Sequence, residues 1–95
     1  MVKTIFKKEF SEIKGIQKKE EILYRLSDDI VDGNSTYGIQ VFSICEDNET
    51  SESVQNISSS KEMVLDIIKY LYENSVKTEN FKDIIFDMYK LSIKS

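Results

Sequence analysis

The residues of this chain that could do chemistry are mostly carboxylates, and they cluster beside two expected turns. The first cluster is Asp28, Asp29 and Asp32, and the second is Glu46, Asp47, Glu49 and Glu52. Carboxylate oxygens bind hard cations such as Ca²⁺ and Mg²⁺, but neither cluster has the spacing of an EF-hand loop. A solvated turn is therefore the simpler interpretation. If the strands between them form a meander, the two clusters could approach each other and make a cation or small-ligand site.

Three further features could have a chemical role, and each has a structural explanation. Cys45 is the only thiol, and the adjacent Glu46 and Asp47 oppose the positive potential that activates a cysteine. Gly38 lacks a Gly-rich phosphate-binding context and is instead typical of a bulge or a close backbone approach. The three serines 58–60 precede a helix N-terminus, which favours anions, but helix capping explains them. We therefore predict no catalytic, cofactor-binding or metal-binding residue.

Several function classes fit the composition poorly. The 95 residues include no His, which is the commonest general base at neutral pH and a frequent metal ligand. Six Lys and three Glu give residues 1–20 a charge of +3, whereas one Arg and eight acids give residues 21–60 a charge of −7. Residues 61–95 hold six charges of each sign, so the net charge is −4. An acidic middle argues against a nucleic-acid surface, which needs basic groups to neutralise phosphates.

The chain has the size and composition of one soluble domain. Hydrophobic residues make up 40% of it and charged residues 32%, which favours a folded core over disorder. Its apolar runs are far shorter than the roughly 20 residues of a membrane span, and its charged start is not a signal peptide. A single cysteine agrees with a reducing compartment. We expect residues 1–95 to form a single cytoplasmic domain without membrane contact.

The elements that must position these residues begin with strands. Residues 22–27 alternate between the two sides of a strand. Residues 37–45 are apolar at nearly every position, which predicts a strand that is buried on both sides or central in its sheet. A loop or hairpin connection over 46–52 and a weaker third strand over 53–57 follow. Residues 1–18 fit a helix, an edge strand flanked by lysines or a loosely attached segment, and we take the edge strand.

Two helices complete the chain. Ser59 and Glu62 fit a capping box, which starts a helix, and Asn74 is suited to the left-handed conformation that stops it. Thr78 is a second N-cap, with Glu79 in the first turn where the helix dipole favours an acid. The apolar stripes, at spacings of three and four residues, are Val64, Ile67, Ile68 and Leu71 in the first helix and Phe81, Ile84, Ile85 and Met88 in the second.

These elements predict an α+β fold. We expect a small antiparallel sheet of three or four strands, arranged as a β-meander, with two C-terminal helices packed on one face. Because residues 37–45 are so apolar, pairing with a second copy would protect them if they lay at a sheet edge. A homodimer is therefore possible.

Four aromatic residues fall outside the apolar stripes of the helices. They are Tyr70, Tyr72, Phe86 and Tyr89. Such residues often mark a surface for a protein partner, because they supply a large contact area at little entropic cost. The alternative is that they cover the edges of a thin core or the N-terminal segment.

The function that we expect is a small protein-interaction or regulatory module, without catalytic activity or cofactor, that binds an unidentified protein partner. An accessory domain that binds a small ligand or cation at the acidic turns is the alternative. A third possibility is an enzyme that uses Asp, Glu, Lys or Tyr as acid and base.

Four segments resemble a family of small uncharacterised proteins from clostridia and related Firmicutes. They are Tyr37-Gly38-Ile39, Ile57-Ser58-Ser59-Ser60, Leu71-Tyr72-Glu73-Asn74-Ser75-Val76 and Lys82-Asp83-Ile84-Ile85-Phe86-Asp87. The resemblance covers roughly residues 22–90. Members usually have proline just after the position matching Val76 or Lys77, where this chain has Lys77 and Thr78. The family has no assigned activity, so the resemblance implies lineage and architecture and no catalytic residue.

Overall fold

The computed structural model describes residues 2–16 and 18–94, with side chains as far as Met88. Four strands are followed by two helices along the chain. The strands are β1 (Val2–Phe10), β2 (Glu20–Val31), β3 (Asn34–Cys45) and β4 (Asn48–Ser58), and the helices are α1 (Lys61–Glu73) and α2 (Thr78–Lys94). This is the predicted α+β architecture, and the N-terminal segment forms an edge strand rather than a helix.

The strands form one antiparallel meander in the order β1-β2-β3-β4. The β2–β3 turn is tight because Asp32 and Gly33 both have positive φ, 51° and 81°, as in two-residue hairpin turns. β3 lies inside the sheet, which confirms the central position predicted for residues 37–45. Because β3 is not an edge strand, it gives no reason for pairing with a second copy, and a homodimer stays a prediction.

β4 begins earlier than the sequence indicates. Residues 46–52 were expected to form a loop or hairpin connection, but only Glu46 and Asp47 make the turn and β4 pairs with β3 from Asn48 onward. The alternating positions of this segment carry Ser, Thr and Glu instead of apolar residues. Hydrophobic periodicity therefore gives little signal for a strand here.

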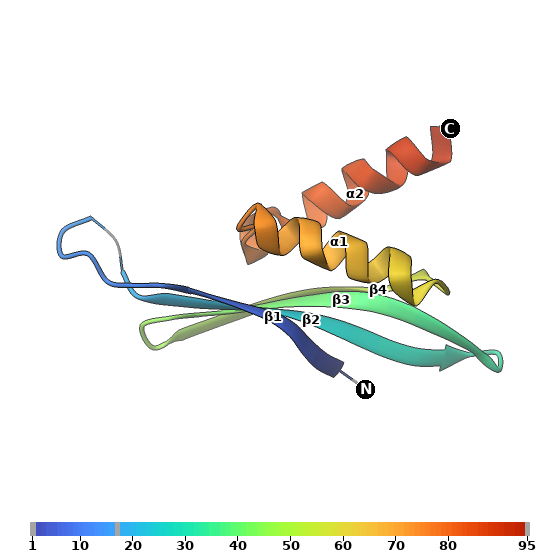
Figure 1. Cartoon of the computed structure of the whole chain (residues 1–95), viewed down its shortest axis with the longest axis horizontal. Coiled ribbons are helices and arrows are strands. Elements are labelled where there is room, and N and C mark those ends of the chain that lie inside the picture. The colour runs from blue at the N-terminus through green and yellow to red at the C-terminus, as the bar shows by residue number, and fades with distance from the viewer. Residues whose placement is uncertain (1, 17, 95) are drawn as a thin grey trace.

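Both helices lie on the same face of the sheet (Figure 1). The buried core between helices and sheet consists of Ile22, Tyr24, Leu26, Ile39, Val41, Ile57, Val64, Ile68, Leu71, Val76, Phe81 and Ile85. Figure 1 shows no helix on the opposite face. There Leu23 lies opposite Phe42, and the guanidinium of Arg25 lies 4.9 Å from the centre of the Phe42 ring. β3 is thus central in the sheet but covered by helices on one face only.

Gly38 marks the close backbone approach that the sequence predicts. A Cβ added to it would lie 2.5 Å from the Val54 carbonyl oxygen and 2.8 Å from the Gln55 Cα. The register between β3 and β4 shifts at this point, between Tyr37 and Ile39, which is a β-bulge. Glycine is therefore required here by lack of space between two backbones.

The start of α1 is displaced by one residue from the predicted cap. The N-cap is Ser60 rather than Ser59, because the Ser60 hydroxyl accepts a hydrogen bond of 3.3 Å from the Met63 amide. The Ser58 hydroxyl in turn accepts from the Ser60 amide at 3.0 Å. Neighbouring serines offer equivalent hydroxyls, so the backbone path decides which one caps the helix.

In the connection between the helices, the left-handed residue also differs by one position from the prediction. Asn74 is the C-cap, but Ser75 takes the left-handed conformation, with a φ of 52°, and the Val76 amide donates to the Leu71 carbonyl as in a Schellman motif. The Lys77 carbonyl accepts from the Phe81 amide at 3.0 Å, so Lys77 occupies the N-cap position and Thr78 is the first residue of α2. Among the described residues, no helix has both the length and the apolar character needed to cross a membrane.

Candidate functional site

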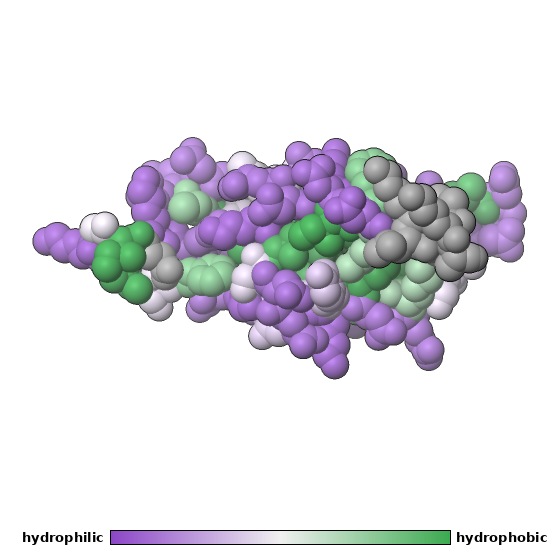
Figure 2. Space-filling model, turned by 90° about the horizontal axis from the view of Figure 1, so that it is seen from above, coloured by the Kyte–Doolittle hydropathy of each residue, from purple (hydrophilic) through white to green (hydrophobic). Residues whose placement is uncertain are grey.

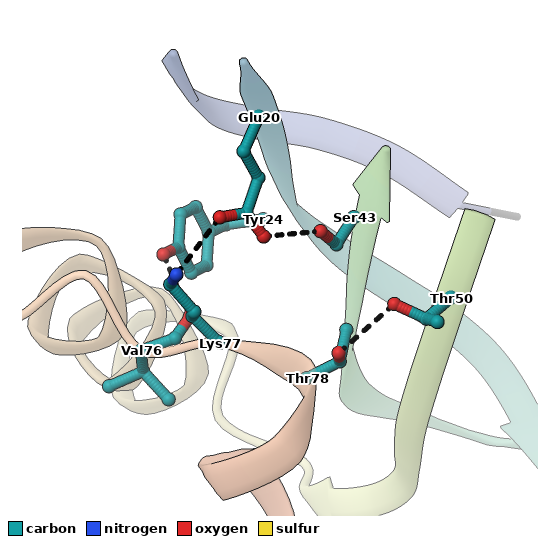
Figure 3. Close-up of polar contacts among 7 residues, drawn as sticks. All are labelled: Glu20, Tyr24, Ser43, Thr50, Val76, Lys77 and Thr78. Carbon is teal, nitrogen blue, oxygen red and sulfur yellow. Dashed lines mark hydrogen bonds and ion pairs between the residues drawn. The ribbon is translucent and has the colours of Figure 1, made fainter. Parts of the chain in front are cut away.

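The first candidate is a cluster of polar side chains where the α1–α2 connection crosses β2 and β3 (Figure 3). The Glu20 carboxylate lies 2.9 Å from Lys77 Nζ and accepts a hydrogen bond of 2.9 Å from Ser43 Oγ. The hydrogen bond with Glu20 raises the pKa of Lys77. A lysine with a raised pKa stays charged at neutral pH, so it is poorly suited to act as a nucleophile or a base.

Tyr24 adds a buried phenol to the same region. Its side chain is fully buried, and its hydroxyl donates a hydrogen bond of 2.9 Å to the Val76 carbonyl. Burial raises the pKa of Tyr24 to about 12, so the phenol is neutral at physiological pH. Beyond the connection, the hydroxyls of Thr50 and Thr78 lie 3.1 Å apart. These bonds fasten the helix connection to the sheet, which is a structural role.

The structure does not bring the two acidic turns together. They lie at the two ends of β3, whose 12 residues span about 36 Å at 3.3 Å per residue. Figure 1 shows the corresponding hairpins at opposite ends of the molecule. The alternative that the two clusters approach each other is therefore wrong, because successive turns of an antiparallel meander alternate between its ends. Within residues 2–16 and 18–94, no group of three or more His, Cys, Asp or Glu is placed to hold a metal ion. Cys45 is a half-buried thiol beside the second turn.

Tyr72, one of the four aromatic residues singled out from the sequence, is half-buried against β1. Its ring stacks on Phe6, with centres 4.6 Å apart, and lies edge-on to Tyr24 at 6.0 Å. Lys8 Nζ lies 5.0 Å from the centre of the same ring and donates a hydrogen bond of 2.8 Å to the Tyr72 carbonyl. In this position Tyr72 covers the N-terminal strand.

Tyr70 and Phe86 are exposed at separate places. Tyr70 is 47% exposed, and because it precedes Tyr72 by two positions it lies on the opposite side of α1. Phe86 is 62% exposed and lies on α2 next to the end of β4. The side chain of Tyr89 lies outside the described residues. The described aromatic residues therefore do not form one continuous patch.

Phe86 borders a shallow apolar hollow of about 200 Å³ between α2 and the end of β4. The other lining residues are Val54, Gln55, Asn56, Ile57 and Ile85. Figure 2 looks onto the helical face and shows hydrophobic residues in green running between rows of hydrophilic residues in purple. Phe86 is thus an exposed aromatic residue beside a hollow that a partner's side chain could fill.

α2 runs alongside β4, and residues of both elements line this hollow. Thr78 contacts Thr50, Lys82 Nζ lies 2.9 Å from the Glu52 carboxylate, and Phe86 reaches the end of the strand. Four helical residues rise about 6.0 Å and two strand residues about 6.6 Å, so the two elements stay in step. The hydrophobic pattern of the sequence does not predict this contact between α2 and the first half of β4. Residues 49–54 do alternate between the two sides of a strand, but most of their side chains are polar. They therefore give a weak indication of a strand.

No curated protein and no solved structure matches the chain. A family model does match, over residues 1–91. The match includes β1 and the turn that follows it as well as the segments on which the sequence resemblance rests. It therefore covers all four strands, α1 and most of α2. On this basis the chain belongs to DUF6514, a family of unknown function.

Proposed function

We propose that this protein is a small cytoplasmic protein-interaction module without catalytic activity, which binds its partner through the β4–α2 surface. We define this surface as residues 48–58 of β4 together with Lys82, Ile85 and Phe86 of α2. The observation that carries the proposal is the position of Phe86, which is 62% exposed and borders an apolar hollow.

An exposed phenylalanine beside a hollow is suited to binding. Burying a phenylalanine side chain contributes about 1.5–3 kcal/mol, and aromatic residues in pockets are frequent hot spots of interfaces. Ile16 and Ile30 are more exposed than Phe86, at 83% and 74%. However, Ile16 lies in a hollow lined mainly by Lys and Glu side chains, and Ile30 lies near the tip of the β2–β3 hairpin. Neither has the apolar surroundings of Phe86.

The polar cluster around Glu20 supports the non-catalytic part of the proposal. Glu20 bonds to both Ser43 and Lys77, and Tyr24 bonds to the helix connection. A general acid or base needs a proton to exchange with a substrate, at a pKa near the working pH. The raised pKa values of Lys77 and Tyr24 move these groups away from that range.

A photocrosslinking amino acid at position 86 tests the proposal. The same amino acid at position 66, an exposed site on α1, is the matched control. In lysate of the source organism, we expect one protein to crosslink from position 86 and not from position 66. Absence of an adduct from position 86, or the same adducts from both positions, would contradict the proposal.

A further inference from the structure

We infer that the β4–α2 surface binds its partner as an added β-strand. The bound segment is extended and basic, pairs with the outer edge of β4 and places one apolar side chain beside Phe86. This inference rests on the proposed function, and it adds the conformation and the charge of the partner. Backbone, hollow and charge each support it separately.

The backbone of β4 is the first support. β4 ends the order of strands, so no described strand pairs with its outer edge. Its pairing with β3 is continuous from Asn48 to Val54, and in such a strand alternate N–H and C=O groups point outward. β4 contains neither Lys nor Pro, which commonly protect edge strands. An extended peptide can satisfy these outward groups by strand addition.

The hollow provides a place for a side chain of the added strand. Beyond Val54 the pairing with β3 is interrupted and resumes at Ser58. The intervening residues, together with Ile85 and Phe86, line the hollow. Side chains of a strand alternate between the two faces of a sheet, so every second side chain of the added strand would point to the face that carries α2. An aliphatic side chain at the level of the hollow would cover the Phe86 ring.

The charges on this surface favour a basic partner. β4 carries Glu49 and Glu52 and no basic residue, and Lys82 forms an ion pair with Glu52. The other charged residues of α2 as far as Met88 are all acidic and exposed: Glu79, Asp83 and Asp87. Charge complementarity of this kind selects among partners and speeds association.

The same charges disfavour a symmetric dimer formed through β4. Antiparallel pairing of two β4 strands would add a second set of Glu49 and Glu52 side chains to the same short stretch of sheet. Like charges on paired strands destabilise the pairing. The occupant is therefore not a second copy of this edge.

The edge strand β1 of a second copy is also a poor occupant, although it is rich in lysine. Lys7 Nζ lies 3.0 Å from the Glu9 carboxylate and 3.4 Å from that of Glu21, and Lys8 donates to α1 and to Ser75. The register of β1 with β2 is also interrupted, between Thr4 and Phe6. Two of its three lysines are thus engaged within their own chain, and the partner is a separate extended segment.

Selection from a library of random peptides of about ten residues, close to the length of β4, tests the inference. The folded protein is the target, and Phe86→Ser is the counter-target. We expect enriched peptides to be rich in Lys and Arg, to carry an apolar residue at one position and to lack Pro in the pairing stretch, because Pro has no N–H to donate. Failure to enrich any peptide over the counter-target would overturn the inference. So would enrichment of acidic peptides or of peptides with apolar residues at helical spacing.

NMR with one enriched peptide then locates the binding site. We expect amide shifts to change over residues 48–54 and 82–86, and the dissociation constant to rise about tenfold or more for Phe86→Ser. Because Phe86 is mostly exposed, this variant should stay folded, which its unfolding temperature would confirm. Shift changes confined to α2 would overturn strand addition and leave the proposed function intact.

Light scattering tests whether a second copy of the chain is the occupant. We expect the protein alone to stay monomeric up to high micromolar concentration. Self-association that Phe86→Ser or the enriched peptide abolishes would identify a second copy as the occupant and overturn the inference of a separate basic segment.

Discussion

The two edge strands of the sheet are held in different ways. β1 contains three lysines and a shift in register, and it is fastened to α1 because Phe6 stacks on Tyr72 and Lys8 bonds to the end of the helix. β4 has no lysine. Its polar contacts with α2 include a pair of threonine hydroxyls and an ion pair with about half of each side chain exposed.

This difference affects how well each edge strand is protected against pairing with another chain. Lysines and irregular register keep an edge strand from pairing with other chains, and natural sheets commonly use such devices. β1 has both along its length, whereas β4 is interrupted only near its C-terminal end, beside the hollow. We call β1 the closed edge, because it carries features that protect an edge strand, and β4 the open edge, because it has no lysine and pairs without interruption from Asn48 to Val54.

The largest effect is expected from Gly38→Ala, which disturbs the attachment of β4 to β3. The new methyl group would collide with the backbone of β4, 2.5 Å from the Val54 carbonyl oxygen. We expect the free energy of unfolding to fall by about 3 kcal/mol, the upper end for overpacking, as measured by urea unfolding. Ser53→Ala, an exposed change on β4, is the control. A loss no greater than that of the control would show that β4 can move aside at little cost.

A slightly smaller loss of stability is expected at alkaline pH, where ionisation of Tyr24 removes its hydrogen bond to the Val76 carbonyl. The pKa of Tyr24 is raised from 10.0 to about 12 by burial. The stability that neutral Tyr24 contributes is complete below pH 10 and is lost as the pH rises from 10 to 12, by about 2 kcal/mol.

Tyr24→Phe is the matched variant for this pH dependence. The pKa of Lys77 is also raised, so its contribution is lost in the same direction as the pH rises and persists in the variant. Urea unfolding at pH 9 and at successive higher values should therefore give a shallower decline for Tyr24→Phe than for the parent. Parallel declines would contradict the assignment to Tyr24.

Tyr72→Ala weakens the attachment of β1, the closed edge, to α1. It removes the stack on Phe6 and the contact with the Lys8 ammonium, so we expect a loss of about 2 kcal/mol, less than for a fully buried aromatic residue. Hydrogen exchange should accelerate in β1 and change little in β4. The control is Tyr70→Ala, on the opposite side of α1, which should change stability by no more than about 0.5 kcal/mol. Equal effects of the two substitutions would remove the distinction between a buried and an exposed tyrosine.

The smallest effect on stability is expected from Phe86→Ser, at the open edge. The side chain is 62% exposed, so thermal unfolding should show a change within about 0.5 kcal/mol. The dissociation constant for the enriched peptide should nevertheless rise about tenfold or more. A destabilisation well above 1 kcal/mol would mean that Phe86 belongs to the core, and the contrast between the two edges would weaken.

How far the sequence predicts this molecule depends on the strength of its hydrophobic pattern. β2 and the helices carry clear apolar periodicity, and β3 is apolar at nearly every position, so their types and order were predicted. The N-cap of α1 was displaced by one residue, because Ser59 and Ser60 are chemically equivalent and only the backbone path distinguishes them. The first half of β4 was missed, because its side chains are polar and hydrogen bonding to β3 makes it a strand.

The candidate site was likewise predicted only in part. By itself, the sequence determined the α+β class, a strand at residues 37–45 that is central or buried on both sides, and a bulge or close backbone approach at Gly38. It also identified Tyr72 and Phe86 as aromatic residues off the helical stripes. Only the tertiary structure decided that Tyr72 holds β1 and that Phe86 stays exposed beside β4. The physical reason is that periodicity reports which side of a helix is apolar, whereas the fate of a side chain on its flank depends on which distant strand lies against it.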